Sequence, residues 1–175
     1  LMVEHGNKTV RVNTRAYGYE NVITKMTACL QKFDCAPKDC ILVFEGMLSK
    51  KLRLQIDPTY KANRGERPDE AYIQFQELRD QLESLWRSLG ALAVTQNYVE
   101  GDDILGYLAA HTEEELVVVT GDGDLAVLNG DNAYGGRTQV YIGGTLGENK
   151  YGPFPHRFIT LYKALVGDAS DNIKG

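Results

Sequence analysis

The stretch Leu116-Val-Val-Val-Thr-Gly-Asp-Gly-Asp-Leu-Ala126 decides the fold class. Its first half is a short, nearly continuous apolar run rich in valine, which is typical of a strand buried on both faces of a parallel sheet. Its second half places glycine and aspartate where the strand ends, and residues 123–128 then predict a short helix before Asn129-Gly130. A strand that leads through a turn directly into a helix is the repeating unit of an α/β domain.

The same alternation extends along the rest of the chain. Apolar spacing predicts further helices over residues 16–33, 69–89, 102–110 and 158–166. Short β-prone runs predict strands over 40–44 and 92–95, with an edge strand over 140–142. We therefore expect an α/β fold with a mainly parallel central sheet and helices on both faces. A length of 175 residues fits one domain, 1–175.

Composition and charge exclude several classes of protein. No apolar run approaches the roughly 20 residues of a membrane span, and the N-terminus lacks a signal-peptide pattern, so we expect a cytoplasmic protein, or one in the host cytoplasm if viral. The three cysteines have no metal-site spacing. The net charge of −5 is uneven: Lys50 to Arg67 holds six basic residues against two acids, whereas Glu100 to Asp124 holds eight acids and no Lys or Arg.

Carboxylates follow the predicted strands at the points where those strands end, and two more, Asp168 and Asp171, follow the last predicted helix. In an open α/β sheet, ligands bind beyond the carboxyl ends of the strands. Each acid alone has an ordinary explanation as a cap or turn residue. Gathered together they would repel one another, and a fold that gathers them needs cations. We predict two Mg²⁺ ions, or Mn²⁺ in their place, that support in-line attack on a phosphodiester. The predicted ligands are Glu45, Glu100, Asp102, Asp103, Asp122, Asp124, Asp168 and Asp171.

Two other motifs overlap the stretch from Gly121 to Ala126. It matches the GxGxxA fingerprint of dinucleotide-binding domains, but Asp122 and Asp124 would repel a pyrophosphate and no acid follows about 20 residues on. It also begins like a calcium-binding loop, but Ala126 stands where an oxygen ligand belongs. An aspartyl-phosphate phosphatase would need its Asp-x-Asp directly after the first strand. Asp122 and Asp124 follow a later strand, so we set this class of enzyme aside. We therefore expect no nucleotide cofactor.

The basic segment supplies groups that complement the acids. An isolated run of Lys and Arg is usually a solvated surface loop. Opposite a carboxylate rim, the same residues would hold substrate phosphates, and an interleaved tyrosine would stack on an unpaired base. The predicted DNA-binding residues are Lys50, Lys51, Arg53, Tyr60 and Arg67, with Lys61 and Arg64 at the reacting phosphate.

Four motifs resemble, in the same order, those of the flap endonuclease and 5′-exonuclease family. This family includes bacteriophage 5′-exonucleases and the 5′-nuclease domain of bacterial DNA polymerase I. Four ordered motifs are far more specific than any one of them. The motifs are Asp57-Pro-Thr-Tyr-Lys-Ala-Asn-Arg64, Glu100-Gly-Asp-Asp-Ile-Leu-Gly106, Thr120-Gly-Asp-Gly-Asp-Leu125 and Val166-Gly-Asp-Ala-Ser-Asp-Asn-Ile173.

The resemblance implies a PIN-like, metal-dependent hydrolase that acts on DNA with 5′ ends, flaps or nicks. It implies that Lys61 and Arg64 lie at the base of a helical arch, so we expect a basic arch-like insertion, and that Asp168 and Asp171 bind the second metal ion. Glu45 stands where the family usually has Asp. We expect a monomer that takes part in DNA replication or repair.

The chain departs from the family pattern at both ends. The family begins with an Asp-bearing strand of the type Leu-Leu-x-Asp-Gly, and no such strand precedes the helix at Tyr17. After Gly175 the family continues into a helical element that grips duplex DNA. We therefore expect a catalytic domain that is incomplete at both ends. Two alternatives stay open: a non-catalytic DNA-binding module of the same fold, and a PIN-like ribonuclease.

Overall fold

The computed structural model describes residues 2–5, 8–11, 14–63, 69–147, 155–168 and 173–174. The chain divides into two compact units. The first comprises Leu1–Leu42 and Glu66–Val94, and the second comprises Val43–Gly65 and Thr95–Gly175. None of the described helices is long and apolar enough to cross a bilayer.

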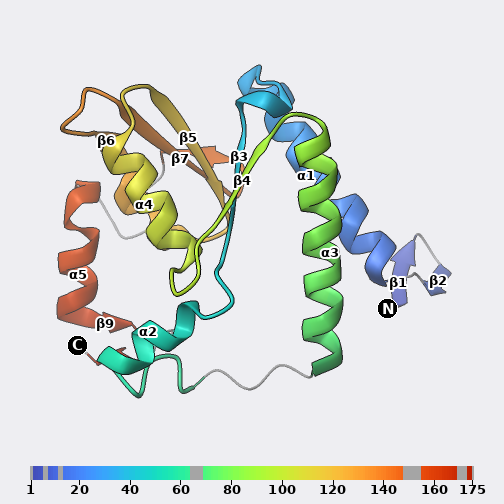
Figure 1. Cartoon of the computed structure of the whole chain (residues 1–175), viewed down its shortest axis with the longest axis horizontal. Helices are drawn as coiled ribbons and strands as arrows, with labels where there is room; N and C mark the ends of the chain where they lie inside the picture. The colour runs from blue at the N-terminus through green and yellow to red at the C-terminus, as the bar shows by residue number, and fades with distance from the viewer. Residues whose placement is uncertain are drawn as a thin grey trace. The chain divides into compact units, whose positions relative to one another are not determined.

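The first unit is built around two long helices, α1 (Thr14–Phe33) and α3 (Asp69–Ser88), which pack side by side (Figure 1). Leu82 and Trp86 are buried on α3, one helical turn apart, as the predicted apolar face requires. Gly90 ends α3 with a φ of +98°, a left-handed conformation that glycine adopts without a steric penalty. A short 3₁₀ helix, η1 (Pro37–Asp39), follows α1.

A hairpin of β1 (Met2–His5) and β2 (Lys8–Arg11) precedes α1. The two strands are antiparallel and form a sheet of their own. Neither strand contains aspartate, so the Asp-bearing first strand of the family pattern has no counterpart among the described residues before α1.

Two strands pair with each other and run from the first unit into the second. These are β3 (Ile41–Phe44) and β4 (Leu92–Thr95), and both agree closely with their predicted bounds. After β3 comes α2 (Ser49–Ile56), a helix that the sequence analysis did not predict. Its Lys, Leu, Arg and Gln residues are good helix formers, and the basic charge of the segment concealed this propensity.

The second unit contains a four-stranded sheet. β5 (Glu115–Thr120) is parallel to β7 (Arg137–Ile142) in the register Glu115 to Arg137, while β6 (Gly130–Asp131) and β8 (Thr145–Leu146) are antiparallel to β7. The predicted α/β class is confirmed. The prediction of an edge strand over 140–142 is wrong, because β7 lies between β5 and β6 in the sheet, with Thr138 and Val140 buried.

The core of the second unit lies between this sheet and two helical segments. Val118 of β5, Val140 of β7 and Leu125 of η2 (Gly123–Leu128) form a buried cluster, and Leu105 of α4 (Gly101–His111) packs against it. The predicted short helix over 123–128 is therefore present as a 3₁₀ helix. It lets the chain turn sharply at the end of β5 while Leu125 returns to the core.

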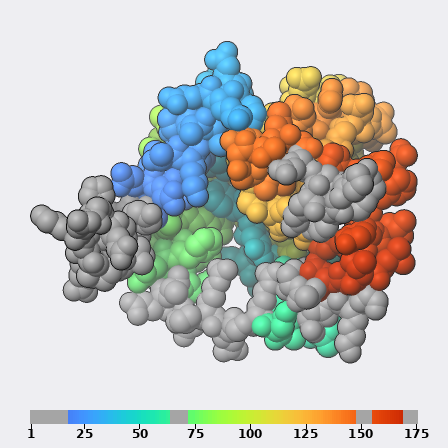
Figure 2. Space-filling model, turned by 180° about the vertical axis from the view of Figure 1, so that it is seen from behind, coloured from blue at the N-terminus to red at the C-terminus, as the bar shows by residue number. Residues whose placement is uncertain are grey.

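The last described helix is α5 (Ile159–Val166), preceded by the 3₁₀ helix η3 (His156–Phe158). Ile159 is buried, while Leu165 is 71% exposed. Figure 2 shows α5, coloured red, at the surface of the molecule. After α5, β9 (Gly167–Asp168) pairs with β10 (Ile173–Lys174), and this pairing fixes the backbone of Asp168.

Candidate active site

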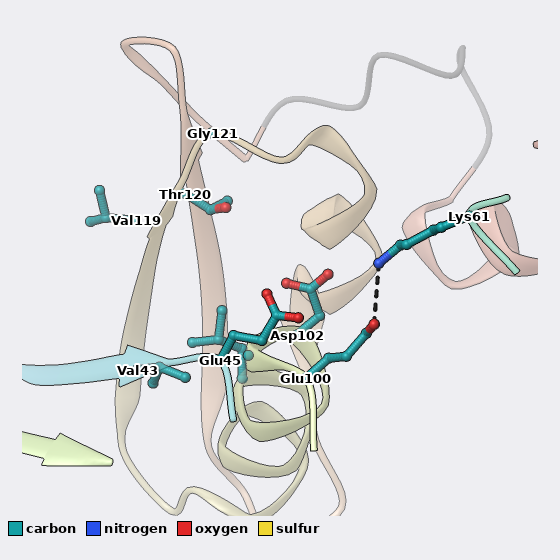
Figure 3. Close-up of a pocket in the computed structure, with 10 residues that line it drawn as sticks. Val43, Glu45, Lys61, Glu100, Asp102, Val119, Thr120 and Gly121 are labelled. Atoms are coloured by element: carbon teal, nitrogen blue, oxygen red, sulfur yellow. Dashed lines mark hydrogen bonds and ion pairs between the residues drawn. The ribbon is translucent and has the colours of Figure 1, made fainter. Parts of the chain in front are cut away.

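A cavity of about 420 Å³ lies in the second unit where β3 and β5 end and α4 begins. Three carboxylates line it, namely Glu45, Glu100 and Asp102, together with Lys61 and Thr120. Figure 3 shows the carboxylates of Glu45 and Asp102 pointing to the same side of the cavity, and Lys61 reaching towards Glu100. The structure thus brings together acids that follow β3 and β4, the two strands of a sheet separate from that of β5.

Glu45 is placed by a close approach of two loops. Gly46 donates from its N–H to the carbonyl of Val99 over 3.2 Å. A Cβ atom at Gly46 would lie 2.0 Å from the carbonyl oxygen of Gln96, so only glycine fits here. The buried Ser49 then donates from its hydroxyl to Glu45 Oε1 over 2.6 Å. The position of Ser49 at the start of α2 gives it this orienting role, which the sequence analysis did not predict.

Glu100 is a buried carboxylate, 8% exposed, and three side chains satisfy it. Tyr60 donates from its hydroxyl to Oε2 over 3.1 Å, and Lys61 donates from Nζ to Oε1 over 3.1 Å. Arg53 Nε lies 3.8 Å from Oε2. A buried charge is tolerated only with such partners. Tyr60, which we predicted to stack on a base, thus donates a hydrogen bond to Glu100.

Lys61 owes its direction to an unusual backbone. Its φ is +55°, in the left-handed region, within a turn that Asp57 stabilises by accepting from the N–H and the hydroxyl of Thr59, each over 2.8 Å. Burial alone would lower the pKa of the Lys61 ammonium, but its hydrogen bonds to Tyr60 and Glu100 outweigh burial and raise that pKa. Lys61 therefore stays charged beside the cavity.

Asp102 and Asp103 are neighbours in sequence and face different partners. Burial, followed by the negative charges of Asp122 and Glu100, raises the pKa of Asp102, and the nearby Lys61 only partly opposes this. Asp103 lies outside the cavity lining and accepts from Arg53 Nη2 over 2.5 Å. Arg53, which we predicted to bind DNA, therefore pairs with a predicted metal ligand.

A second group of acids surrounds Lys163, a residue that the sequence analysis did not single out. Lys163 donates to Asp124 Oδ2 over 2.5 Å and forms an ion pair with Asp168. These hydrogen bonds outweigh the effect of burial and raise the pKa of the ammonium. Asp122 caps η2 by accepting from the N–H of Asp124 over 2.8 Å. The available signal was a single lysine in the otherwise uncharged helix 159–166.

Across residues 14–63, 69–147 and 155–168, no three carboxylate, imidazole or thiol side chains already stand close enough together to hold a metal ion. Like charges separate when no cation is between them, and several of these acids instead pair with Lys or Arg. Of the other predicted residues, Lys50 and Lys51 are exposed on α2. Arg64, Arg67 and Asp171 lie outside the described residues.

Comparison with known proteins identifies the family. Residues 5–151 match the family model of the 5′-3′ exonuclease N-terminal resolvase-like domain. The chain is 35% identical to a 5′-3′ exonuclease of Buchnera aphidicola, over 79% of this chain and 48% of that protein. It is 32% identical to DNA polymerase I of Bacillus caldotenax, over 100% of this chain and 20% of the polymerase. The chain thus spans half or less of the length of these relatives.

Solved structures show the same fold. A bacteriophage T5 protein co-crystallized with metal ions aligns with a TM-score of 0.69 at 19% identity, over 90% of this chain and 62% of that one. A bacteriophage T5 flap endonuclease variant in complex with DNA and metal ions aligns with a TM-score of 0.58 at 18% identity, over 90% and 61%. The chain therefore belongs to the flap endonuclease and 5′-3′ exonuclease family, as its four ordered motifs predicted.

Proposed function

We propose that this chain is the catalytic domain of a divalent-metal-dependent 5′-nuclease that hydrolyses phosphodiester bonds in DNA at 5′ ends, flaps or nicks. The observation that carries the proposal is the cavity that Glu45, Glu100 and Asp102 line together with Lys61. Family membership supports it, as do the names of the relatives, a 5′-3′ exonuclease and a flap endonuclease bound to DNA and metal ions.

The donor set fits hard cations such as Mg²⁺ or Mn²⁺, because every candidate ligand is an oxygen. Burial and then the negative charges of Asp122 and Glu100 raise the pKa of Asp102, and a bound cation would favour its ionised form. Glu45, Glu100 and Asp102 would hold a first ion. A pair of bound ions would align the phosphodiester with its attacking water and stabilise the charge that develops on it. The second ion would be held by Asp122, Asp124, Asp168 and Asp171, with Asp103 near the first.

The protein's own cations would orient the substrate. Lys61 is held at the cavity by Glu100, with its ammonium 4.6 Å from the ring centre of Tyr60. A phosphate that enters the cavity would meet this ammonium opposite the carboxylates, where it stabilises negative charge in a partly desolvated setting. Exposed Lys50 and Lys51 on α2 would contact phosphates further along the strand, as would Arg67, while Arg64 would join Lys61 at the reacting phosphate.

One rival function is favoured by a specific observation. Among the described residues no three acids are arranged to hold a metal ion, and Lys163 bridges Asp124 and Asp168. A domain with its acids neutralised internally would bind DNA through Lys50 and Lys51 and would not cut it.

The test is cleavage of a 5′-labelled DNA flap with Mg²⁺, with Mn²⁺ and with chelator. We expect product that requires metal and is lost in Asp102→Asn. Asp131→Asn is the matched control, because Asp131 has a side chain that is 83% exposed and does not line the cavity. DNA binding without metal-dependent product would favour the binding module. Faster cleavage of a matched RNA flap would favour a ribonuclease.

A further inference from the structure

Three aromatic side chains gather at the end of α4 that lies away from the cavity. The helix begins at Gly101, which lines the cavity, and ends at His111. The rings of Tyr107 and His111 stack with centroids 4.2 Å apart, and the ring of Tyr134 lies 5.4 Å from that of His111. Tyr107 is 64% exposed and Tyr134 is 57% exposed. We call these three residues the aromatic patch.

The loop that carries Tyr134 is fixed to the helix. Asn132 donates from Nδ2 to the carbonyls of Ala109 and Thr112 over 2.9 and 2.7 Å. Its Oδ1 accepts from the N–H groups of Tyr134 and Gly136 over 2.8 and 3.1 Å. A rigid, exposed aromatic surface loses little conformational freedom when a partner binds, which is the property of the aromatic anchors at protein interfaces.

The surroundings of the aromatic patch are acidic. Glu113, Glu114 and Glu115 begin two residues after His111 and are all exposed, and Asp131 precedes the loop of Tyr134. The C-terminal end of α4 adds a partial negative charge. Arg137 lies 3.9 Å from Asp131 and offsets part of that charge. This combination repels phosphate and attracts cations, which also bind favourably over the faces of tyrosine rings.

We propose that the aromatic patch docks an arginine- or lysine-rich segment of a partner protein. The side chains of that segment would lie over Tyr107 and Tyr134, and its charge would be met by Glu113 and Glu114. Electrostatic complementarity of this kind sets which partner binds and how fast. His111 lies ten residues beyond Gly101, which lines the cavity, so these two ends of α4 are about 15 Å apart along the helix axis. Docking there would tether the domain and leave the cavity open to DNA.

The test uses the whole chain and a fluorescent peptide of alternating arginine and glycine, with binding followed by fluorescence anisotropy and by amide chemical shifts. We expect shifts centred on the aromatic patch and binding at least tenfold weaker in Tyr107→Ala/Tyr134→Ala. Tyr72→Ala is the matched control, since Tyr72 is an exposed tyrosine on α3, in the other unit. It should bind the peptide as the unaltered protein does.

A second variant, Glu113→Lys/Glu114→Lys, tests the charge without removing an aromatic ring. It should also weaken peptide binding at least tenfold, and added salt should narrow the difference. Unchanged affinity in both variants would overturn the proposal. So would a labelled single-stranded oligonucleotide that shifts the same amides in place of the peptide.

Discussion

Two pairs of acids in the second unit differ in what neutralises them. Glu45 and Asp102 line the cavity, and around Asp102 the charges of Asp122 and Glu100 outweigh that of Lys61. Asp124 and Asp168 are instead joined by the ammonium of Lys163. We call the first pair the cavity carboxylates and the second the bridged carboxylates. The difference teaches that, among the described residues, Lys61 does not offset the negative charges around Asp102, whereas the bridged carboxylates already have a cation in Lys163.

This contrast gives the two halves of the proposed metal site different properties. A cation that enters the cavity would relieve repulsion that is present in the folded protein. A cation that binds between Asp124 and Asp168 would first displace Lys163, and the free energy of those ion pairs would be subtracted from its affinity. We therefore expect metal to bind the cavity more tightly than the bridged carboxylates.

The largest effect is expected for Asp102→Asn. Loss of a negative oxygen donor from the cavity should lower kcat/KM on flap DNA about 10³-fold, which corresponds to roughly 4 kcal/mol of lost transition-state stabilisation. In chelator the same variant should melt at a higher temperature, because the repulsion from Asp122 and Glu100 is gone. Steady-state kinetics and thermal melts measure both. Normal cleavage would refute a catalytic role for the cavity carboxylates.

The next effect is expected for Lys61→Met, which keeps an unbranched side chain of similar length and removes its charge. Cleavage should fall about 10²-fold, because a preorganised cation at the reacting phosphate is lost and Glu100 loses its 3.1 Å partner. The matched control is Lys50→Met, at an exposed position on α2. It should change the salt dependence of binding and leave the maximal rate within about twofold. Equal losses of cleavage rate in the two variants would mean that Lys61 only binds a substrate phosphate and does not take part in catalysis.

Much of this site could be predicted because it follows from strand ends. Glu45 comes directly after a short apolar run, Glu100 and Asp102 lie at the start of the helix that follows another, and parallel topology brings such positions to one edge. The divergence of Asp102 and Asp103 could also have been foreseen. Successive residues of a helix point about 100° apart, so both cannot face the same cavity. The sequence prediction grouped them because both follow the strand over 92–95 and belong to the same family motif.

Other features depend on contacts between segments that are distant in sequence. Lys163 reaches Asp124 across 39 positions, and nothing in the local pattern of α5 specifies that partner. The same limit explains the position of β7, whose short apolar run predicts a strand but not its place between β5 and β6. Local spacing predicts elements well, while strand order and ion pairing are set by tertiary packing.

A smaller effect is expected for Lys163→Met, which removes the cation from the bridged carboxylates. Mn²⁺ should bind about fivefold more tightly at this position, because an ion-pair contribution of roughly 1 kcal/mol no longer competes. The metal-free variant should melt at a lower temperature than the unaltered protein, since Asp124 and Asp168 then repel. Isothermal titration with Mn²⁺ and melts in chelator separate these outcomes. Lys163→Arg keeps the charge and should behave as the unaltered protein does, while weaker Mn²⁺ binding by Lys163→Met would mean that Lys163 organises the site.

The smallest effect concerns the pH dependence of stability in chelator. Burial and neighbouring charge raise the pKa of Asp102 above its ordinary value of 3.8, so between 3.8 and the raised pKa the folded state holds more protons than the unfolded state. The contribution of Asp102 to stability therefore falls as pH rises through that window. The contribution of Asp57 to stability depends on pH in the opposite direction. Hydrogen bonds from Thr59 lower the pKa of Asp57, so its contribution is lost as pH falls through the lowered value.

The measurement is the difference in stability between each variant and the unaltered protein, which cancels the titration of all other acids. The advantage of Asp102→Asn should grow from about pH 4 upward and then level off above the raised pKa. For Asp57→Asn, the stability deficit should shrink as the pH falls below 4. Adding Mn²⁺ should reverse the first trend, because a bound cation favours the ionised form of Asp102 and leaves the exposed Asp57 unaffected. If the difference in stability between Asp102→Asn and the unaltered protein does not change with pH in chelator, the cavity carboxylates are neutralised within the chain, as the bridged carboxylates are.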